Sequence, residues 1–124
     1  MAERSYTTPD TSWTNTSPEP GQYFFGERYF SVQEIRESGP RTLFTPETAD
    51  LERLAAFDVF HAHSGTYEID GTTLTIRPTL AKSPNSMDGS AYRYAYDLTG
   101  DRLTITRTTT DGSETRVTIL SRIE

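Results

Sequence analysis

The sequence predicts a mainly β protein: an antiparallel up-and-down β-barrel of about seven or eight strands, with one helix at about 46–62 closing an end. Three observations lead to this prediction. From Ser64 onward, apolar and polar residues alternate with the period of two that is typical of half-buried strands. Turns that contain glycine separate these segments at intervals of roughly ten residues. One stretch with helical apolar spacing precedes them.

Residues 1–20 are expected to form an extended N-terminal segment ahead of the barrel domain at 21–124. The segment is rich in Thr, Ser and Pro, and its prolines at 9, 18 and 20 limit regular strand pairing. A short first strand near Arg4–Thr8 fits this pattern. Trp13 is the apolar anchor of the segment.

The barrel domain opens with a predicted hairpin. Gln22–Phe25 and Tyr29–Arg36 flank Gly26-Glu27-Arg28, which is a connection of the hairpin type. Both faces of these strands carry apolar residues, so the hairpin is expected to be covered on both sides.

The predicted helix has a clear beginning. Thr45 suits the N-cap, Pro46 the first helical position and Glu47 the first turn. Apolar residues then recur at spacings of three and four, which indicates a buried stripe. The stripe consists of Leu51, Leu54, Phe57 and either Phe60 or His61.

The strands after the helix follow one another as hairpins. Asp70-Gly71 is the strongest turn signal in the chain and joins Thr66–Asp70 to Thr72–Leu80. Residues 81–90 form a polar loop at one barrel mouth. The remaining predicted strands are Ala91–Leu98, Arg102–Thr109 and Glu114–Ile123.

The composition of the chain indicates which classes of binding partner and which compartment to expect. The chain has 124 residues, enough for one domain, and its net charge of −6 disfavours nucleic acid and anionic membranes. It has no cysteine, which excludes disulfides and thiol catalysis and fits a reducing compartment. The N-terminus lacks an apolar signal region, so a cytoplasmic protein is expected. The sequence leaves both a monomer and a homodimer open.

Tyrosines supply the best candidates for a cavity wall, because a phenol combines an apolar face with a hydrogen-bond donor. Lys82, Arg77 and Arg107 could pair with a ligand carboxylate, although solvated positions on the outer face are expected for Lys82 and Arg77. Arg107 shares strand parity with Leu103 and Ile105, which favours an inward direction. The predicted ligand-binding residues are Tyr23, Phe25, Tyr29, Gln33, Tyr67, Tyr92, Tyr96 and Arg107.

Catalysis and metal binding have fewer candidates. His61 could transfer a proton near neutral pH, with Tyr94 as a donor, although a histidine at a helix end more commonly interacts with the helix dipole. His61 and His63 are the two histidines of the chain, so no metal site is expected despite the nearby Asp58. No nucleophile elbow, phosphate-binding glycine loop or dinucleotide fingerprint occurs, and no cofactor is expected.

Three stretches resemble the bacterial lipocalin-like domain family: GQYFFGERYFSVQEIR, PETADLERLAAFDVFHAHSGTYEID and GDRLTIT. The resemblance covers about residues 21–124, and its most specific part is Ser64-Gly65-Thr66-Tyr67. It implies a lipocalin-like barrel with a cavity for a small, mostly apolar molecule. The family usually opens with a Gly-x-Trp strand, whereas here Ser12 precedes Trp13.

The expected function is therefore binding of a small hydrophobic or amphipathic molecule in the barrel cavity. The alternative is a cofactor-free cyclase or isomerase that uses the same cavity to fold a natural-product-like substrate and to move a proton. A third reading is a structural module whose barrel is packed solid with aromatic side chains. A cavity of a few hundred Å³ separates the first two readings from the third.

Overall fold

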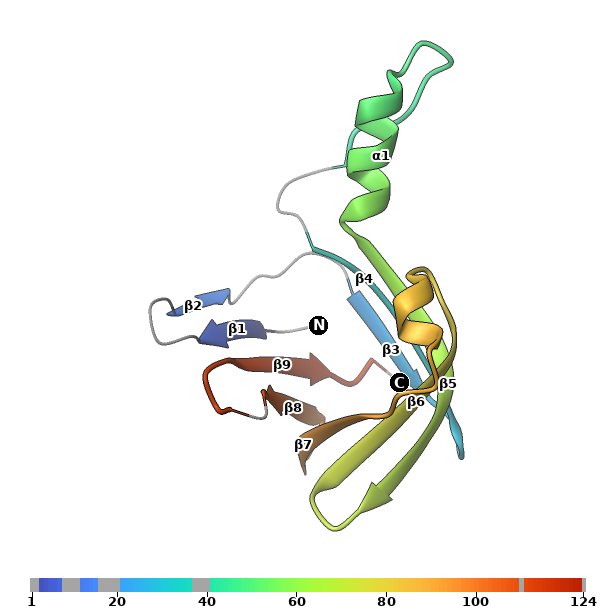
Figure 1. Ribbon diagram of the computed structural model, residues 1–124. Coiled ribbons are helices and arrows are strands. Elements are labelled where there is room, and N and C mark those ends of the chain that lie inside the picture. The colour runs from blue at the N-terminus through green and yellow to red at the C-terminus, as the bar shows by residue number, and fades with distance from the viewer. Residues whose placement is uncertain (1–2, 8–11, 16–20, 37–40, 110, 124) are drawn as a thin grey trace.

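The structure is a computed structural model that describes the backbone of residues 3–7, 12–15, 21–36, 41–109 and 111–123, and the side chains of these ranges from residue 21 onward. It confirms a mainly β, antiparallel and nearly closed barrel with one short helix (Figure 1). The elements are β1 (Glu3–Thr7), β2 (Ser12–Asn15), β3 (Gly21–Phe25), β4 (Tyr29–Ile35), α1 (Asp50–Asp58), β5 (Phe60–Asp70), β6 (Thr73–Ala81), the 3₁₀-helix η1 (Pro84–Met87), β7 (Tyr92–Thr99), β8 (Arg102–Thr108) and β9 (Thr115–Ser121).

The seven strands β3 to β9 form a continuous meander, each strand paired with the next in sequence. The sheet order β2-β1-β9-β8-β7-β6-β5-β4-β3 adds β1 and β2 beside the last strand. Glu3 pairs with Ile119, and Tyr6 pairs with Trp13 across the β1–β2 ladder. The role of Trp13 as an apolar anchor lies outside the described side chains. Because β2 and β3 remain the two edges of the sheet, the barrel is nearly closed rather than closed.

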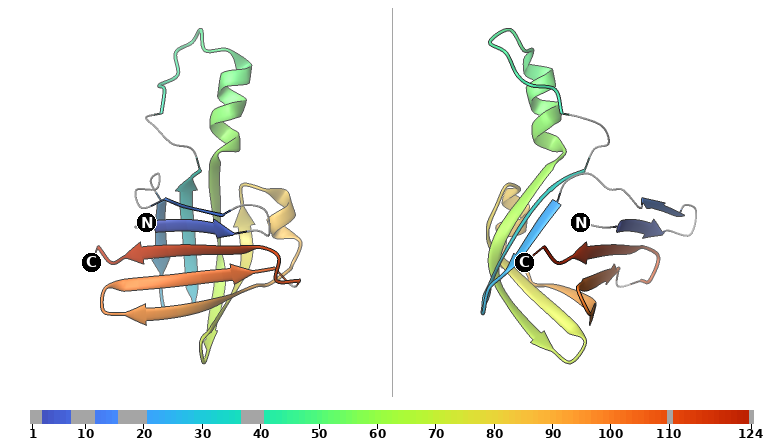
Figure 2. Two further views of the ribbon diagram at one scale, coloured as in Figure 1. Left: turned by 90° about the vertical axis from the view of Figure 1, so that its left-hand side faces the viewer. Right: turned by 180° about the vertical axis from the view of Figure 1, so that it is seen from behind.

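The sheet curls so strongly that its two halves face each other. Figure 2 shows β7, β8, β9 and β1 running across the direction of β3 to β6. A β-bulge contributes to this curl: Ser64 pairs with Leu80 but Gly65 pairs with Pro78, so β6 carries an extra residue there. Such bulges increase the local twist of a strand pair. Gly65 permits the close approach, because a Cβ there would lie 2.0 Å from the carbonyl oxygen of Arg77.

The predicted tight turns are confirmed. Gly71 between β5 and β6 has φ of 61°, and Gly100 between β7 and β8 has φ of 58°. These values lie in the left-handed region, where a residue with a Cβ is disfavoured. Both glycines therefore fix the length of the connection and the register of the strands that it joins.

The hydrophobic core lies inside the barrel, between the two facing halves of the sheet. Its members alternate with exposed or partly exposed residues along each strand, as the pleat requires. Several tyrosines and Leu103 pack against it. The buried apolar residues are Phe30, Val32, Leu74, Ile76, Ile105 and Leu120.

The helix begins later than predicted. Thr45 and Thr48 form a separate turn before it, in which the Thr45 amide donates to Thr48 Oγ1 at 2.8 Å and the Thr48 amide donates to the Thr45 carbonyl at 3.0 Å. Hydroxyl-to-backbone bonds of this kind compete with helix formation. The helix starts only at Asp50, with Ala49 rather than Thr45 as its N-cap.

The helix also ends earlier, and it does not close the barrel. Phe60 and His61 pair with Ile35 and Glu34 of β4, so the residues predicted to extend the helix belong to β5. Figure 1 shows α1 projecting beyond the barrel, and none of its residues is buried. Only its last turn borders the barrel mouth, through Phe57 and Asp58. No helix in the described ranges is long and apolar enough to cross a membrane.

Candidate ligand cavity

An open cavity of about 640 Å³ lies at the mouth of the barrel that faces α1 and η1. This volume is in the range of roughly 300–1,000 Å³ that is usual for small-molecule sites. The apolar part of its wall combines aromatic rings from β7 with the end of the helix and a proline of β6. These residues are Phe57, Pro78, Tyr92 and Tyr94.

Positive charge also gathers in the wall of the cavity. Four cationic side chains line it, whereas Asp58 is the one carboxylate among the described lining residues. The cavity thus has a charge opposite in sign to the whole chain, whose net charge is −6. The four cationic residues are Arg36, Lys82, Arg107 and Arg116.

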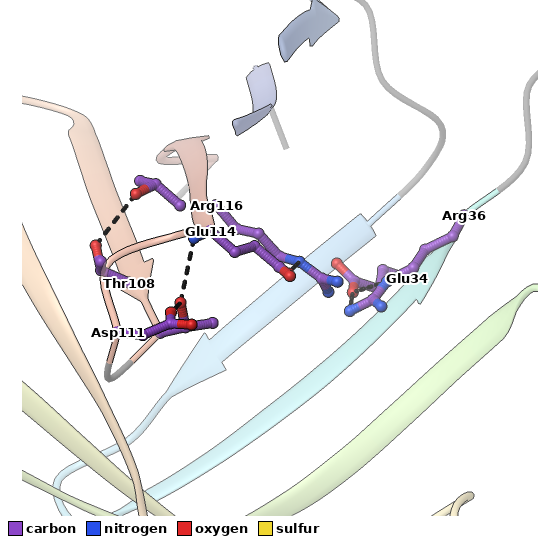
Figure 3. A network of polar contacts seen from close by, with 8 residues as sticks. Glu34, Arg36, Thr108, Asp111, Glu114 and Arg116 are labelled. Carbon is purple, nitrogen blue, oxygen red and sulfur yellow. Dashed lines mark hydrogen bonds and ion pairs between the residues drawn. The ribbon is translucent and has the colours of Figure 1, made fainter. Parts of the chain in front are cut away.

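A buried carboxylate holds part of this charge in place. Glu34 on β4 is only 4% exposed, and its Oε1 lies 2.7 Å from Arg36 Nη2 and 2.8 Å from Arg36 Nε. Tyr23 Oη donates to Glu34 Oε2 at 3.3 Å. Figure 3 shows Arg116 reaching from β9 toward Glu34 while Arg36 approaches it from β4. A buried charge needs such partners, because its desolvation is costly when it is unpaired.

The turn between β8 and β9 positions Arg116. Glu114 Oε1 lies 2.9 Å from Arg116 Nε, and the Glu114 amide donates to Thr109 Oγ1 at 3.1 Å. Asp111 accepts bonds from the Thr109 hydroxyl at 2.8 Å and from the Ser113 amide at 3.0 Å. Bonds from the Ser113 hydroxyl and amide and from Thr109 lower the pKa of Asp111 to about 2. The turn is therefore ordered by ionised Asp111 at neutral pH (Figure 3).

Arg107 is held differently from the other arginines. Its guanidinium carbon lies 5.2 Å from the centre of the Tyr92 ring, within the range of a cation–π contact. Arg107 on β8 also stands directly opposite Arg116 on β9 in the strand register. Two cations thus face the cavity from neighbouring strands.

Lys82 fixes the helix end at the mouth. Its ammonium group donates to the carbonyl oxygen of Phe57 and lies 4.2 Å from the centre of the Phe57 ring. A cation is favourable at a helix C-terminus, where the carbonyl groups have no intrahelical donor. Lys82 consequently keeps Phe57 beside the cavity although the rest of the helix projects away.

Two titratable groups in the cavity have shifted pKa values. Burial lowers the pKa of His63 below its ordinary 6.5, although the nearby carboxylate of Glu34 raises it in part. Burial raises the pKa of Tyr94 above its ordinary 10.0, with Arg107 opposing the change. At neutral pH, therefore, His63 is an uncharged imidazole and Tyr94 is a protonated phenol. An imidazole that can accept a proton and a phenol that can donate a hydrogen bond line the same cavity.

The structure brings four of the predicted site residues together in the cavity wall. They are His61, Tyr92, Tyr94 and Arg107.

Four other predicted residues do not line the cavity: Tyr23, Phe25, Tyr67 and Tyr96. Tyr23, Tyr67 and Tyr96 pack against the buried core. The rings of Phe25 and Tyr67 meet edge to face, with 5.3 Å between their centres. The phenol of Tyr96 donates to the carbonyl of Gly71 at 3.0 Å. These side chains contribute to the barrel interior without lining the cavity.

Tyr29 and Gln33 correct the sequence prediction, because both lie on the outer face of β4. Tyr29 is 68% exposed and Gln33 is also exposed, whereas Phe30 and Val32 of the same strand are buried. Side chains alternate across a strand, so burial of one set directs the other outward. With apolar residues on both faces, the sequence pattern did not distinguish them.

Sequence reasoning missed several charged residues of the cavity. Glu34 and Arg36 share the strand parity of Phe30 and Val32, and this parity was the available signal. Lys82 lies in a polar loop and Arg116 beside apolar Val117, so neither had a distinguishing pattern. The missed residues of the cavity and its network are Glu34, Arg36 and Arg116. Lys82 was expected at a solvated position, and His63 was considered only as a metal ligand, yet both line the cavity.

Within the described ranges, no group of three or more His, Asp or Glu side chains is arranged to hold a metal ion. Comparison of the chain with family models, with curated proteins and with solved structures finds no match.

Proposed function

We propose that the protein binds a small hydrophobic or amphipathic molecule in the cavity at the barrel mouth. The observation that supports this proposal is the cavity itself, which has a volume of about 640 Å³ and an apolar wall formed by Phe57, Pro78, Tyr92 and Tyr94. A barrel that served only as a structural module would fill this space with side chains. Apolar walls with a few polar groups are typical of small-molecule sites.

The resemblance to lipocalin-like domains supports the same proposal. An antiparallel meander curled into a nearly closed barrel, with a cavity at one mouth, is the architecture that this resemblance implies. We propose accordingly that the chain is a lipocalin-like barrel and that its partner is a small molecule. The net charge of −6 argues against nucleic acid and anionic membranes as partners.

Binding can be tested with the neutral fluorescent probe N-phenyl-1-naphthylamine, whose emission rises in an apolar site. We expect a saturable rise with the wild-type protein and several-fold weaker binding for Tyr92→Ala, which removes apolar wall. Tyr29→Ala is the matched control, because that side chain is on the outer face and 68% exposed. Equal loss of binding in both variants, or no saturable binding by the wild type, would contradict the proposal. Native mass spectrometry of the freshly purified protein can identify the natural ligand.

A second candidate is a cofactor-free cyclase or isomerase. The observation that favours it is the presence of Tyr94 as a protonated phenol and of His63 as an uncharged imidazole in one cavity. Tyr94 would donate a hydrogen bond to a substrate carbonyl, and His61 or His63 would accept a proton from the adjacent carbon and return it to another carbon of the same molecule, so that no net proton is gained or lost. The cavity wall would hold the flexible substrate in a reactive conformation.

The enzyme hypothesis is tested on the molecule identified by mass spectrometry. Tyr94→Phe, His61→Gln and His63→Gln should each retain binding of that molecule, and loss of turnover identifies the groups that move the proton. If turnover remains intact in all three variants, the catalytic assignment fails while the binding proposal stands.

A further inference from the structure

The opposed arginines at the cavity are an unfavourable arrangement in the free protein. Arg107 and Arg116 are directly paired residues on adjacent antiparallel strands, and both line the cavity. Like charges directly opposite each other on a sheet face repel and destabilise the pair. An anion placed between them would turn this repulsion into two attractive contacts.

Arg107 has unused capacity for such an anion. Its described contact is with the ring of Tyr92, at 5.2 Å from the ring centre. Among the residues whose side chains the structure describes, no carboxylate forms an ion pair with Arg107. A guanidinium carries five donors in a planar fork that matches the two oxygens of a carboxylate. Arg107 also lines the cavity, so its guanidinium can be reached by a ligand there.

The balance of charge points to a single negative charge on the ligand. Among the described side chains, three carboxylates offset the four cationic groups of the wall: Asp58 in the wall, Glu34 beside Arg36 and Glu114 beside Arg116. One positive charge remains in excess among these groups. A carboxylate neutralises this excess, whereas a phosphate with nearly two charges would exceed it.

The apolar wall of the cavity indicates the chemistry of the rest of the ligand. Tyr92 and Tyr94 lie beside Arg107, and Phe57 and Pro78 belong to the same wall. A ligand with its charged end at the arginines could therefore cover these apolar surfaces with its body. Removing water from this wall would strengthen the charge interaction, because the effective dielectric constant falls.

We propose that the ligand is an amphipathic monocarboxylate whose carboxylate is bound by Arg107 together with Arg116. This inference rests on the proposed function, because it names the chemical class of the molecule that the cavity binds. Arg107 is the residue that distinguishes an anionic ligand from a neutral one, and Tyr92 keeps its guanidinium in position.

The test compares two pairs of probes that share a carbon skeleton and differ in the head group, a carboxylate or a primary alcohol: dodecanoate with dodecan-1-ol, and 2-naphthoate with 2-naphthylmethanol. Affinities are measured by isothermal titration calorimetry at low ionic strength for the wild type and for Arg107→Gln. Arg77→Gln is the matched control, because Arg77 lies on the outer face of β6 and pairs with the exposed Glu68 at 2.8 Å. Circular dichroism confirms that each variant is folded.

We expect the wild type to bind at least one carboxylate about tenfold or more tightly than the matching alcohol, since hydrogen bonds to a charged group are stronger than neutral ones. Arg107→Gln should remove most of this preference, so that the affinity for the carboxylate falls toward the affinity for the alcohol. Arg77→Gln should change neither affinity.

The other outcomes separate this inference from the proposed function. Equal binding of carboxylate and alcohol, or an unchanged preference in folded Arg107→Gln, would overturn the monocarboxylate inference and leave the binding function standing. If no carboxylate and no alcohol bound to the folded wild type, the proposed function would fall and the inference with it.

Discussion

The interior of the barrel has two parts that differ in chemistry although the same strands build both. On β4, the inward residues Phe30 and Val32 are each 3% exposed, and the next inward residues are Glu34 and Arg36. On β8, buried Ile105 is followed two residues later by Arg107, which lines the cavity. On each strand, the inward-facing residues at one end therefore belong to the core, and those at the other end belong to the cavity.

This difference shows that each strand has some residues that stabilise the fold and others that can bind a ligand, rather than some strands serving stability and others binding. The apolar part excludes water and supplies most of the folding free energy. The charged part gains little from burial and keeps groups that a ligand can use. Substitutions in the two parts should therefore have different consequences.

The largest effect is expected in the packed part. Phe30→Ala should lower the free energy of unfolding by about 3–5 kcal/mol, because it removes a buried ring and leaves a cavity. Urea denaturation followed by circular dichroism measures the loss. Tyr29→Ala, its exposed neighbour on the same strand, should cost less than about 1 kcal/mol. Similar losses in both variants would contradict the assignment of the inward face of β4.

A second large effect is expected at the bulge that curls one half of the barrel toward the other. Gly65→Ala should destabilise the protein by about 3 kcal/mol, because its Cβ would lie 2.0 Å from a backbone oxygen that no side-chain rotation can move. Gly26→Ala is the matched control, with 3.6 Å to its nearest neighbour and ordinary van der Waals contact. Thermal unfolding of both variants tests this. A Gly65→Ala protein as stable as the control would mean that the strands approach less closely.

A smaller effect concerns pH and lies where the two parts meet. Burial lowers the pKa of His63 below 6.5, so between the two pKa values the unfolded chain binds more protons than the folded protein. His63 thus makes the free energy of unfolding fall as the pH falls from 7 through 6.5 toward the lower, folded-state pKa. Urea denaturation at pH 7 and pH 5 should show a smaller decrease for His63→Gln than for the wild type. The same decrease in both proteins would exclude this role for His63.

The smallest effect is expected in the charged part and has the opposite sign. Arg107→Gln removes one of two opposed cations, so it should raise the free energy of unfolding by a few tenths of a kcal/mol, within the range for opposed like charges of about 0.2–1 kcal/mol. Chemical denaturation at low and high salt is the measurement, and the gain should shrink at high salt. A clear loss of stability would place Arg107 among the structural residues.

The comparison also explains which parts of the fold were predictable from the sequence. The hairpins followed from local signals, because Asp70-Gly71 and Gly100 require backbone conformations that few other residues accept. The end of the helix could not be predicted in this way. The spacing of Phe57 and Phe60 is typical of a helix, but in the structure Phe60 pairs with Ile35 of β4 and belongs to a strand. That pairing joins residues far apart in the chain, and a local pattern does not contain it.

The cavity was harder to predict than the core for a related reason. Val117 and Ile119 make one face of β9 look apolar, yet the buried residue of this strand is Leu120, on the opposite face with Arg116. Tyr92 and Tyr94 were predictable because aromatic residues alternate regularly in β7. The charged groups were not, because a polar residue inside a barrel has the same local pattern as one on its surface.

The pairing of β1 with β9 places the third residue of the chain beside the hundred-and-nineteenth. During synthesis, β1 leaves the ribosome long before β9, one of its two neighbours in the sheet, has been made. The strands from β3 to β9 can pair in the order in which they are made, whereas the pairing of β1 with β9 must wait until β9 has been made. The order of translation and the order of assembly therefore differ for the β1–β2 hairpin, which is made before β3 to β9 and joins their sheet only when β9 is in place.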